Sequence, residues 1–209
     1  MRAMRGLLAL CLLAALSVVL TGCGGEAKKA EAAPAVAKPR CPNPAAWQKL
    51  ANRVGVPVYC PGWLPDPLTG KLGAVDNNID SVSPDRSYLQ SWVWQETGGG
   101  AAGGELHVNL RAYPGRTKIP TCRTGGSDSR NVPCFAAPVG RISSNGISSP
   151  VYTVNQDADL WHYLVLWRRG GTLYTLSEHV APPLSGQKVR QYLKRELASL
   201  VLVRPSASR

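Results

Sequence analysis

The sequence has little of several residue types. It holds one Phe, two Met and three His, and its 13 acidic residues are outnumbered by 24 Lys and Arg, which gives a formal net charge of +11. The composition excludes a coiled coil and a collagen-like protein, and no internal repeat is present. Only one apolar run approaches the length of a membrane span, which excludes a polytopic membrane protein. Because hydrophobic residues still make up 44% of the chain, an intrinsically disordered chain is excluded as well.

Motifs of common enzyme and metal sites are also missing. The chain contains no His-Glu-x-x-His, no Gly-x-Ser-x-Gly and no Cys-x-x-Cys. Gly98, Gly100 and Gly103 match the dinucleotide fingerprint, but a strand rather than a helix is predicted to follow, so a hairpin loop is the better interpretation. Ser185-x-x-Lys188 lacks the Lys-Thr-Gly element that penicillin-binding enzymes need, and Ser185 is interpreted as a helix N-cap. A Ser-His-Asp site assembled from distant residues stays open as an alternative.

The amino-terminal segment is the most informative part of the sequence. Arg2 and Arg5 precede an almost wholly apolar run over residues 6–20. That run is shorter than the roughly 20 residues that span a bilayer, and it matches the apolar core of an export signal. It ends in Leu20-Thr21-Gly22-Cys23, which Gly24 follows.

These four residues resemble the lipobox of bacterial lipoproteins, in which Leu, a small residue and Gly or Ala precede a Cys. The resemblance implies that residues 1–22 are a cleaved signal peptide. It also implies that Cys23 carries a diacylglyceryl group and fatty acyl chains such as palmitate, which hold the protein on the extracytoplasmic face of the cell membrane. Gly24 stands where Asp is the usual inner-membrane retention signal, so that signal is absent. An uncleaved anchor and an ordinary signal with a chance Cys are the alternatives.

A tether and one globular domain are predicted to follow the signal. Residues 23–40 are rich in Ala, Lys, Glu and Pro and contain no aromatic residue, so they cannot bury enough apolar surface to fold. The globular domain is predicted over residues 41–204, which is long enough to form a core without help. Residues 205–209 are predicted to be a disordered tail.

Four cysteines fall in this domain, namely Cys41, Cys60, Cys122 and Cys134. An even number of cysteines outside the cytoplasm predicts disulfides. We favour Cys41–Cys60 and Cys122–Cys134, since each closes a short loop and neither crosses the core; two other pairings stay open. A zinc site formed by all four cysteines is a further alternative, which the absence of a Cys-x-x-Cys pair disfavours.

The domain is predicted to have an α+β fold. Asn43 and Pro44 open a helix, as N-cap and first residue, and Gly55 is placed to end it. The remaining segments are strands over residues 86–96, 105–113 and 151–154, a long loop over 114–138, a turn region over 143–149 and a closing helix over 186–201. We expect a curved antiparallel sheet of about five to seven strands, with an N-terminal and a C-terminal helix packed on it.

A two-residue turn at Gly170-Gly171 predicts a hairpin between residues 160–169 and 172–180. This register pairs Trp167 with Tyr174 and His162 with His179. Two histidines do not make a metal site, because a third ligand would have to come from elsewhere in the chain. No metal and no cofactor are therefore assigned.

The order of the segments, from the Trp63-Leu64-Pro65 loop to the amphipathic last helix, is similar to that of small uncharacterised extracytoplasmic lipoprotein domains. It resembles the half-barrel of lipoprotein carriers more distantly. The resemblance brings no catalytic motif with it, so no site residue is transferred.

Two groups of side chains are candidates for binding. Trp92 and Trp94 share one face of a predicted strand, where they form either a stacking platform or core beneath the last helix. The stretch over residues 106–156 has Asp128 as its sole acid. If the domain is tethered to a membrane, the cations of this stretch face an anionic surface. Each Lys or Arg near such a surface contributes about 1 kcal/mol to the free energy of binding to it. The cations taken as candidates are Arg111, Arg116, Arg123 and Arg130.

Together these features predict a non-enzymatic, lipid-anchored module that binds or scaffolds an anionic partner, such as a wall polymer or an envelope protein, and no nucleic acid. One alternative is a carrier of an apolar ligand in a half-barrel, which predicts a large cavity lined by Trp and Leu. Another is an envelope hydrolase, which predicts a pocket that holds His107 or His162 with a carboxylate partner.

Overall fold

The computed structural model describes residues 38–71, 82–94, 106–123, 129–135, 137–154, 162–180 and 184–206. The predicted signal peptide, Cys23 and the tether up to residue 37 lie outside these residues, as does the glycine motif over 98–103.

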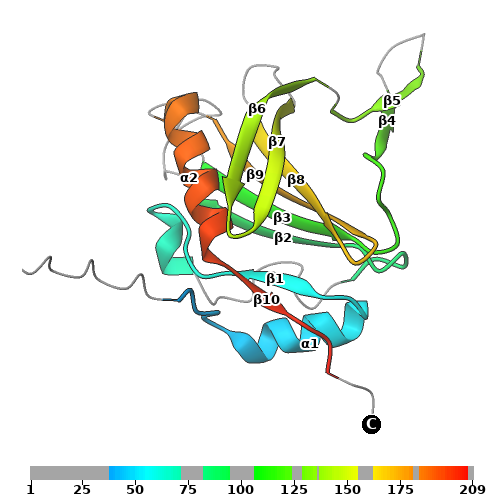
Figure 1. Ribbon diagram of the computed structural model, residues 1–209, viewed down its shortest axis with the longest axis vertical. Helices are drawn as coiled ribbons and strands as arrows, with labels where there is room; N and C mark the ends of the chain where they lie inside the picture. Colours follow the sequence, from blue (N-terminus) through cyan, green and yellow to red (C-terminus); the bar gives the residue numbers. More distant parts are fainter. Residues whose placement is uncertain are drawn as a thin grey trace, which may run out of the picture. The chain divides into compact units, whose positions relative to one another are not determined.

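Six antiparallel strands form the main sheet, in the order β2-β3-β9-β8-β7-β6 (Figure 1). Two further sheets have two strands each. The α+β class and the antiparallel sheet are thereby confirmed. In chain order the strands of the main sheet are β2 (Tyr88–Trp94), β3 (Leu106–Tyr113), β6 (Pro138–Ser144), β7 (Ile147–Val154), β8 (His162–Arg169) and β9 (Thr172–His179).

The β8–β9 hairpin has the register that its turn predicted. Trp167 lies opposite Tyr174, and His162 lies opposite His179. Gly170 and Gly171 have φ values of 54° and 73°, the left-handed conformation that a type I′ turn requires at both central residues. Every residue of β9 is buried, because β3 and β8 flank it in the interior of the sheet.

A second hairpin, between β6 and β7, replaces the turn region predicted over residues 143–149. Its turn is Asn145-Gly146, with φ values of 51° and 70°, and Asn-Gly is the residue pair that such a turn favours. The serines around it alternate too weakly in hydropathy to predict strands from the sequence. The Asn145 side-chain amide donates a hydrogen bond to the carbonyl of Leu200 at 2.8 Å.

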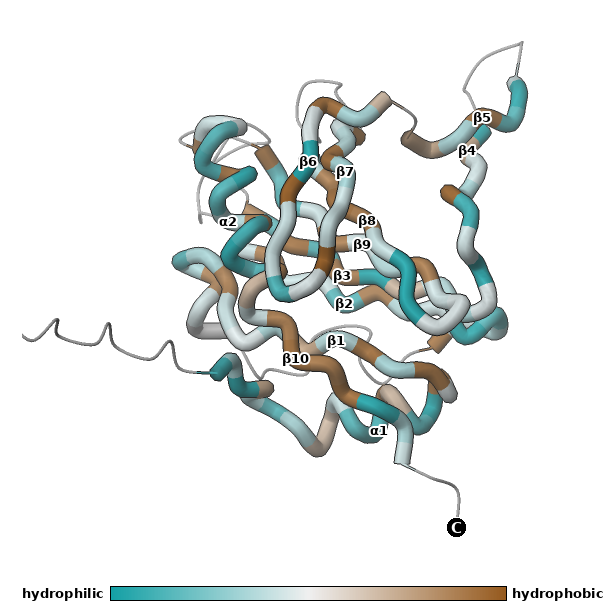
Figure 2. The backbone as a smooth tube through the Cα atoms, in the orientation of Figure 1, coloured by the Kyte–Doolittle hydropathy of each residue, from teal (hydrophilic) through white to brown (hydrophobic). Residues whose placement is uncertain are grey.

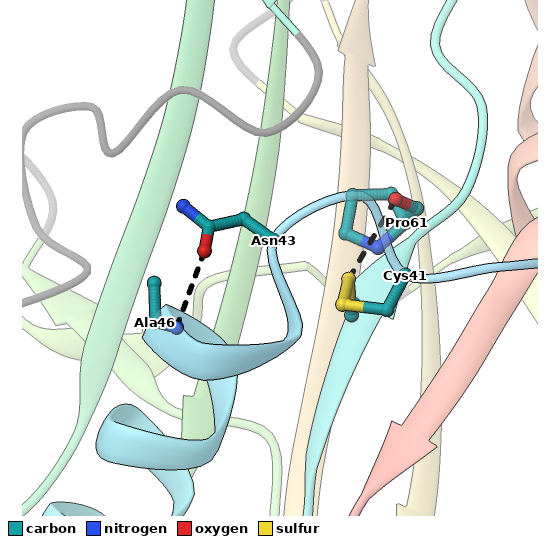
Figure 3. Close-up of a disulfide and its surroundings, with 5 residues drawn as sticks. Cys41, Asn43, Ala46 and Pro61 are labelled. Atoms are coloured by element: carbon teal, nitrogen blue, oxygen red, sulfur yellow. Dashed lines mark hydrogen bonds between the residues drawn. A yellow bond between two sulfur atoms is a disulfide. The ribbon is translucent and has the colours of Figure 1, made fainter.

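The first helix, α1 (Pro44–Val54), begins and ends where predicted. The Asn43 side chain accepts a hydrogen bond from the backbone N–H of Ala46 at 3.3 Å (Figure 3). Gly55 follows the helix with a φ of 76°, in the left-handed conformation. Next to the cap, Cys41 is bonded to Cys60 of β1 (Val58–Pro61). This disulfide ties the start of the helix to the strand, as predicted.

The last helix is shorter than predicted. α2 (Gly186–Ser199) begins after Ser185, whose hydroxyl accepts a hydrogen bond from the N–H of Lys188 at 3.2 Å. The helix predicted over 186–201 was wrong at its end, since β10 (Leu200–Val203) is a strand that pairs with β1. Leu-Val-Leu-Val continues the apolar stripe of the helix, but its β-branched residues favour a strand once a partner strand is present.

The main core lies between one face of the main sheet, the two helices and the β1–β10 pair (brown segments in Figure 2). Trp47 of α1 stacks on Trp92 of β2, with 6.5 Å between ring centroids. Tyr59 of β1 packs edge-on against Trp167 and Tyr174 of the β8–β9 hairpin. α1 itself lies against β1 and β10 (Figure 1).

The C-terminal residues of the described chain make hydrogen bonds to α1. The backbone N–H of Ser206 donates to the Asn52 side chain at 2.7 Å, and the Gln48 amide donates to the carbonyl of Arg204 at 2.7 Å. The described chain is thus hydrogen-bonded to α1 as far as Ser206, two residues into the segment predicted to be a tail. Residues 207–209 lie outside the described part.

The long loop predicted over 114–138 contains a small hairpin, formed by β4 (Thr121–Arg123) and β5 (Asn131–Pro133). Cys122 and Cys134 are bonded to each other, so both predicted disulfides are present. With all four sulfurs in disulfides, the alternative of a four-cysteine zinc site does not hold in this structure.

Candidate functional site

A cleft of about 350 Å³ opens on the face of the main sheet opposite the main core. Its floor is formed by side chains of the central strands, among them Asn109 of β3, Leu164 of β8 and Ser177 of β9. Its rim comes from the disulfide-bonded segment, through Cys122 and Cys134. The Cys122–Cys134 bond thus holds one wall of the cleft.

Strand alternation explains which residues line the cleft. In β3, Leu106, Val108 and Leu110 are buried in the main core, and the intervening residues point to the other face of the sheet. Asn109 and Arg111 are two of these, and both line the cleft.

The cleft lining carries a cation and several uncharged hydrogen-bonding groups. Arg111 supplies a guanidinium, while Thr175 and Ser177 supply hydroxyls. The Ser91 hydroxyl donates to the carbonyl oxygen of the Asn109 side chain, so the amide nitrogen of Asn109 remains as a donor. Neither Asp nor Glu is found among the described residues that line this cleft.

Acidic groups are few elsewhere in the described part as well, where they number four: Asp66, Asp85, Glu178 and Glu196. Asp85 accepts hydrogen bonds from Ser87 and forms an ion pair with Arg116 at 2.8 Å, and these contacts lower the pKa of its carboxyl. Glu178 and Glu196 are fully buried. The solvent-exposed surface that the structure describes is therefore strongly basic.

The structure separates the four predicted arginines. Arg111 alone among them lines the cleft. Arg123 in β4 and Arg130 just before β5 are exposed on the hairpin that forms the rim. Arg116 is held by Asp85, outside the cleft. The four arginines of the basic stretch therefore do not form one patch, and only Arg111 contributes its side chain to the cleft lining.

The predicted aromatic platform is not exposed as such. Trp92 is 2% exposed and stacks on Trp47, and Trp94 is half-buried against the same core. Of the two interpretations of Trp92, core is the one observed, and its ring offers no surface for stacking a ligand. The reason is that α1 and the β1–β10 pair cover this face of the sheet.

The three histidines of the chain meet beside the cleft. β3, β9 and β8 are neighbours in the sheet and bring together His107, His179 and His162. The His107 ring lies 4.3 Å from that of His162 and 4.7 Å from that of His179, between centroids. The Nε2 atoms of His107 and His162 are 2.7 Å apart. His162 also lines the cleft.

Sequence reasoning paired His162 with His179 but missed His107. The pairing of β3 with β9 links residues 60 to 70 positions apart in the chain, and nothing local encodes it. The one available signal was the position of His107 on the polar face of an alternating strand.

All three imidazoles are buried, with 9% or less of each residue exposed. Burial, together with the neighbouring His107 and His179, lowers the pKa of His162 to about 3. His162 is therefore neutral at neutral pH. Within the described ranges, no three His, Cys, Asp or Glu side chains are already arranged to hold a metal ion.

Two buried carboxyls lie on the opposite face of the sheet, in the main core. Glu178 of β9 and Glu196 of α2 are 0% exposed, and their oxygens make no hydrogen bond to the described residues. Burial raises the pKa of both groups, and the proximity of Glu196 raises that of Glu178 further. Burial therefore favours the protonated form of both carboxyls. They were missed because a Glu within an amphipathic segment is expected to face solvent.

Comparisons of the chain with family models, with curated proteins and with solved structures found no match. Function has to be inferred from the site. Neither described helix combines the length and the apolar character needed to cross a bilayer.

Two alternatives from the sequence can be set beside the cleft. The hydrolase hypothesis needed a carboxylate beside His107 or His162, and the described cleft lining contains none. The carrier hypothesis needed a cavity lined by Trp and Leu. Three tryptophans instead fill the main core, namely Trp47, Trp92 and Trp167.

Proposed function

We propose that the chain is a lipid-anchored extracytoplasmic protein whose domain binds an anionic component of the cell envelope. The proposed binding site is the cleft on the face of the main sheet opposite the main core. The observation that carries this proposal is the cleft lining, in which Arg111 and neutral donors occur without a carboxylate.

The chemistry of these groups suits phosphate and carboxylate. A guanidinium presents a planar fork of N–H donors that matches either anion, and such charge-assisted hydrogen bonds are the strong ones. The amide of Asn109 and the hydroxyls of Thr175 and Ser177 supply further donors around the same space. A volume of about 350 Å³ is at the small end of ligand sites, so one charged group or short segment of a larger partner fits.

The proposed anchor adds to this chemistry. A domain tethered through Cys23 stays near a surface that attracts cations. The mature chain from residue 23 has a formal net charge of +9, and the exposed Arg123 and Arg130 adjoin the cleft. Tethering therefore raises the local concentration of the partner around a basic surface.

The anchor is tested on the native product. We expect mass spectrometry to find an amino-terminal Cys23 that carries a diacylglyceryl group, and Cys23→Ser to move the protein from the membrane to the soluble extracytoplasmic fraction. An unmodified thiol at Cys23, or an intact segment over residues 1–22, would contradict the anchor.

The cleft is tested by titrating the purified mature protein with glycerol phosphate polymer and with phosphatidylglycerol vesicles, against phosphatidylcholine vesicles. Arg111→Gln is expected to weaken binding about 10-fold or more, because a charge-assisted contact is lost. Arg116→Gln is the matched control, since Arg116 is exposed but ion-paired outside the cleft. Equal losses in both variants would show that net charge, and not the cleft, drives binding.

A further inference from the structure

We propose that His107, His162 and His179 form a binding site for one transition-metal ion of the zinc or copper class, with an open coordination position that faces the cleft. This inference goes beyond anion binding and does not depend on it.

Strand order is the first argument. The three histidines come from three neighbouring strands of one rigid sheet, and the register places His162 directly opposite His179. Their ring centroids lie 4.3, 4.7 and 5.2 Å apart. This cluster contains all three histidines of the chain, and imidazole is a ligand that suits Zn²⁺ and Cu²⁺.

The donor atoms are the second argument. The Nε2 atoms of His107 and His162 converge at 2.7 Å. Two nitrogens bound to one tetrahedral zinc ion at 2.0–2.1 Å stand about 3.3 Å apart. A shift of well under 1 Å therefore makes room for an ion between them.

The third ligand requires a side-chain rotation. His179 stacks on His107 with 20° between the ring planes. As the side chains stand, no three His, Cys, Asp or Glu residues of the described ranges form a group that could hold a metal ion. The site is completed on binding, when His179 turns toward an ion that His107 and His162 already hold.

The surroundings of His162 suit a metal ligand. Imidazole coordinates metal as the neutral base. The buried Nδ1 of His162 makes no hydrogen bond to the described residues, so it is able to carry the ring hydrogen when Nε2 is bound to metal. His162 lines the cleft, which gives an ion a route from solvent and leaves a further coordination position for water.

The test uses the full mature protein, stripped with a chelator and titrated with ZnCl₂ by calorimetry. We expect one ion per chain. Each of His107→Gln, His162→Gln and His179→Gln is expected to weaken the affinity for zinc by about 100-fold or more, at or above the upper end of what loss of an outer-sphere partner costs. Asp85→Asn is the control, because it removes an exposed oxygen ligand away from the cluster, and it is expected to leave the affinity unchanged.

A second measurement covers the case in which a histidine variant does not fold, which circular dichroism reports. The wild-type protein is loaded with one equivalent of Cu²⁺ and measured by electron paramagnetic resonance, and nitrogen hyperfine splitting from imidazole is expected. Absence of saturable zinc binding, copper without nitrogen splitting, or a folded His179→Gln variant of unchanged affinity would each overturn the three-histidine site.

Discussion

The two faces of the main sheet have opposite characters. One face packs against α1, α2 and the β1–β10 pair, and it holds the largest cluster of buried apolar residues. The other face has a smaller apolar cluster around Phe135, Tyr152, Leu166 and Leu173, and it leaves a cleft between polar side chains and the disulfide-bonded hairpin. We expect the first face to supply most of the stability of the domain, and the proposed binding chemistry lies on the second.

β9 shows how close the two environments are. Glu178 and His179 are adjacent in sequence, but strand alternation sends Glu178 into the main core and His179 to the histidine cluster. Burial favours the neutral form of Glu178 on one side of the sheet and of His162 on the other. A single strand thus separates a packed interior from a potential binding site.

The largest expected contrast comes from leucine truncation. Leu110 is 0% exposed in the main core, so Leu110→Ala is expected to lower the free energy of unfolding by about 3–4 kcal/mol through lost burial and a cavity. Leu164 is half-buried in the cleft, so Leu164→Ala is expected to lower the free energy of unfolding by only about 1 kcal/mol. Urea denaturation measures both, and equal losses would break the distinction between the faces.

The two disulfides extend the same contrast. Replacing Cys41 and Cys60 by Ser is expected to lower global stability by about 3 kcal/mol, because a covalent constraint on the unfolded chain is lost. Replacing Cys122 and Cys134 is expected to cost less, since the β4–β5 hairpin is mostly exposed and can unfold locally. The second change should instead weaken phosphate-polymer binding. A larger stability loss from the second pair would refute this division.

The buried carboxyls predict a pH dependence of stability on the core face. The folded-state pKa of Glu196 is raised by burial, so its contribution is full below the ordinary pKa of the unfolded chain and is lost as the pH rises above it. Glu196→Gln removes this loss and is expected to raise stability at pH 8, relative to pH 5, by on the order of 2 kcal/mol. Denaturation curves at both pH values measure it. An unchanged pH profile would show that the carboxyl is not kept protonated.

The smallest effect is expected at the exposed ion pair. Asp85→Asn removes the contact with Arg116, but solvent screens the pair and water replaces the hydrogen bonds. We expect no measurable change in the melting temperature, and none in binding to the cleft. A clear gain in anion binding would place the released Arg116 within the functional surface.

Local chemistry was predicted well from the sequence. The cap residues of α1, the Gly170-Gly171 turn with the register of its hairpin, and both disulfides were predicted from segments of about 20 residues or fewer, since capping, turn conformation and short-loop closure depend on neighbours in the chain. The resemblance of residues 20–23 to a lipobox is local in the same way, and both this resemblance and lipid attachment at Cys23 stay predictions. The predictions failed where the conformation of a segment depends on a partner that is distant in the sequence.

What the sequence by itself determined is therefore the class of the fold, the ends of α1, the disulfide pairing and the alternation that gives each strand two faces. Tertiary structure alone decided which strands became neighbours. Pairing with β1 turned residues 200–203 into a strand, helix packing buried Trp92, and the contact of β3 with β9 brought His107 to the other two histidines. The physical reason is that strand pairing and core burial reward contacts between distant segments, and such contacts leave no short-range pattern in the chain.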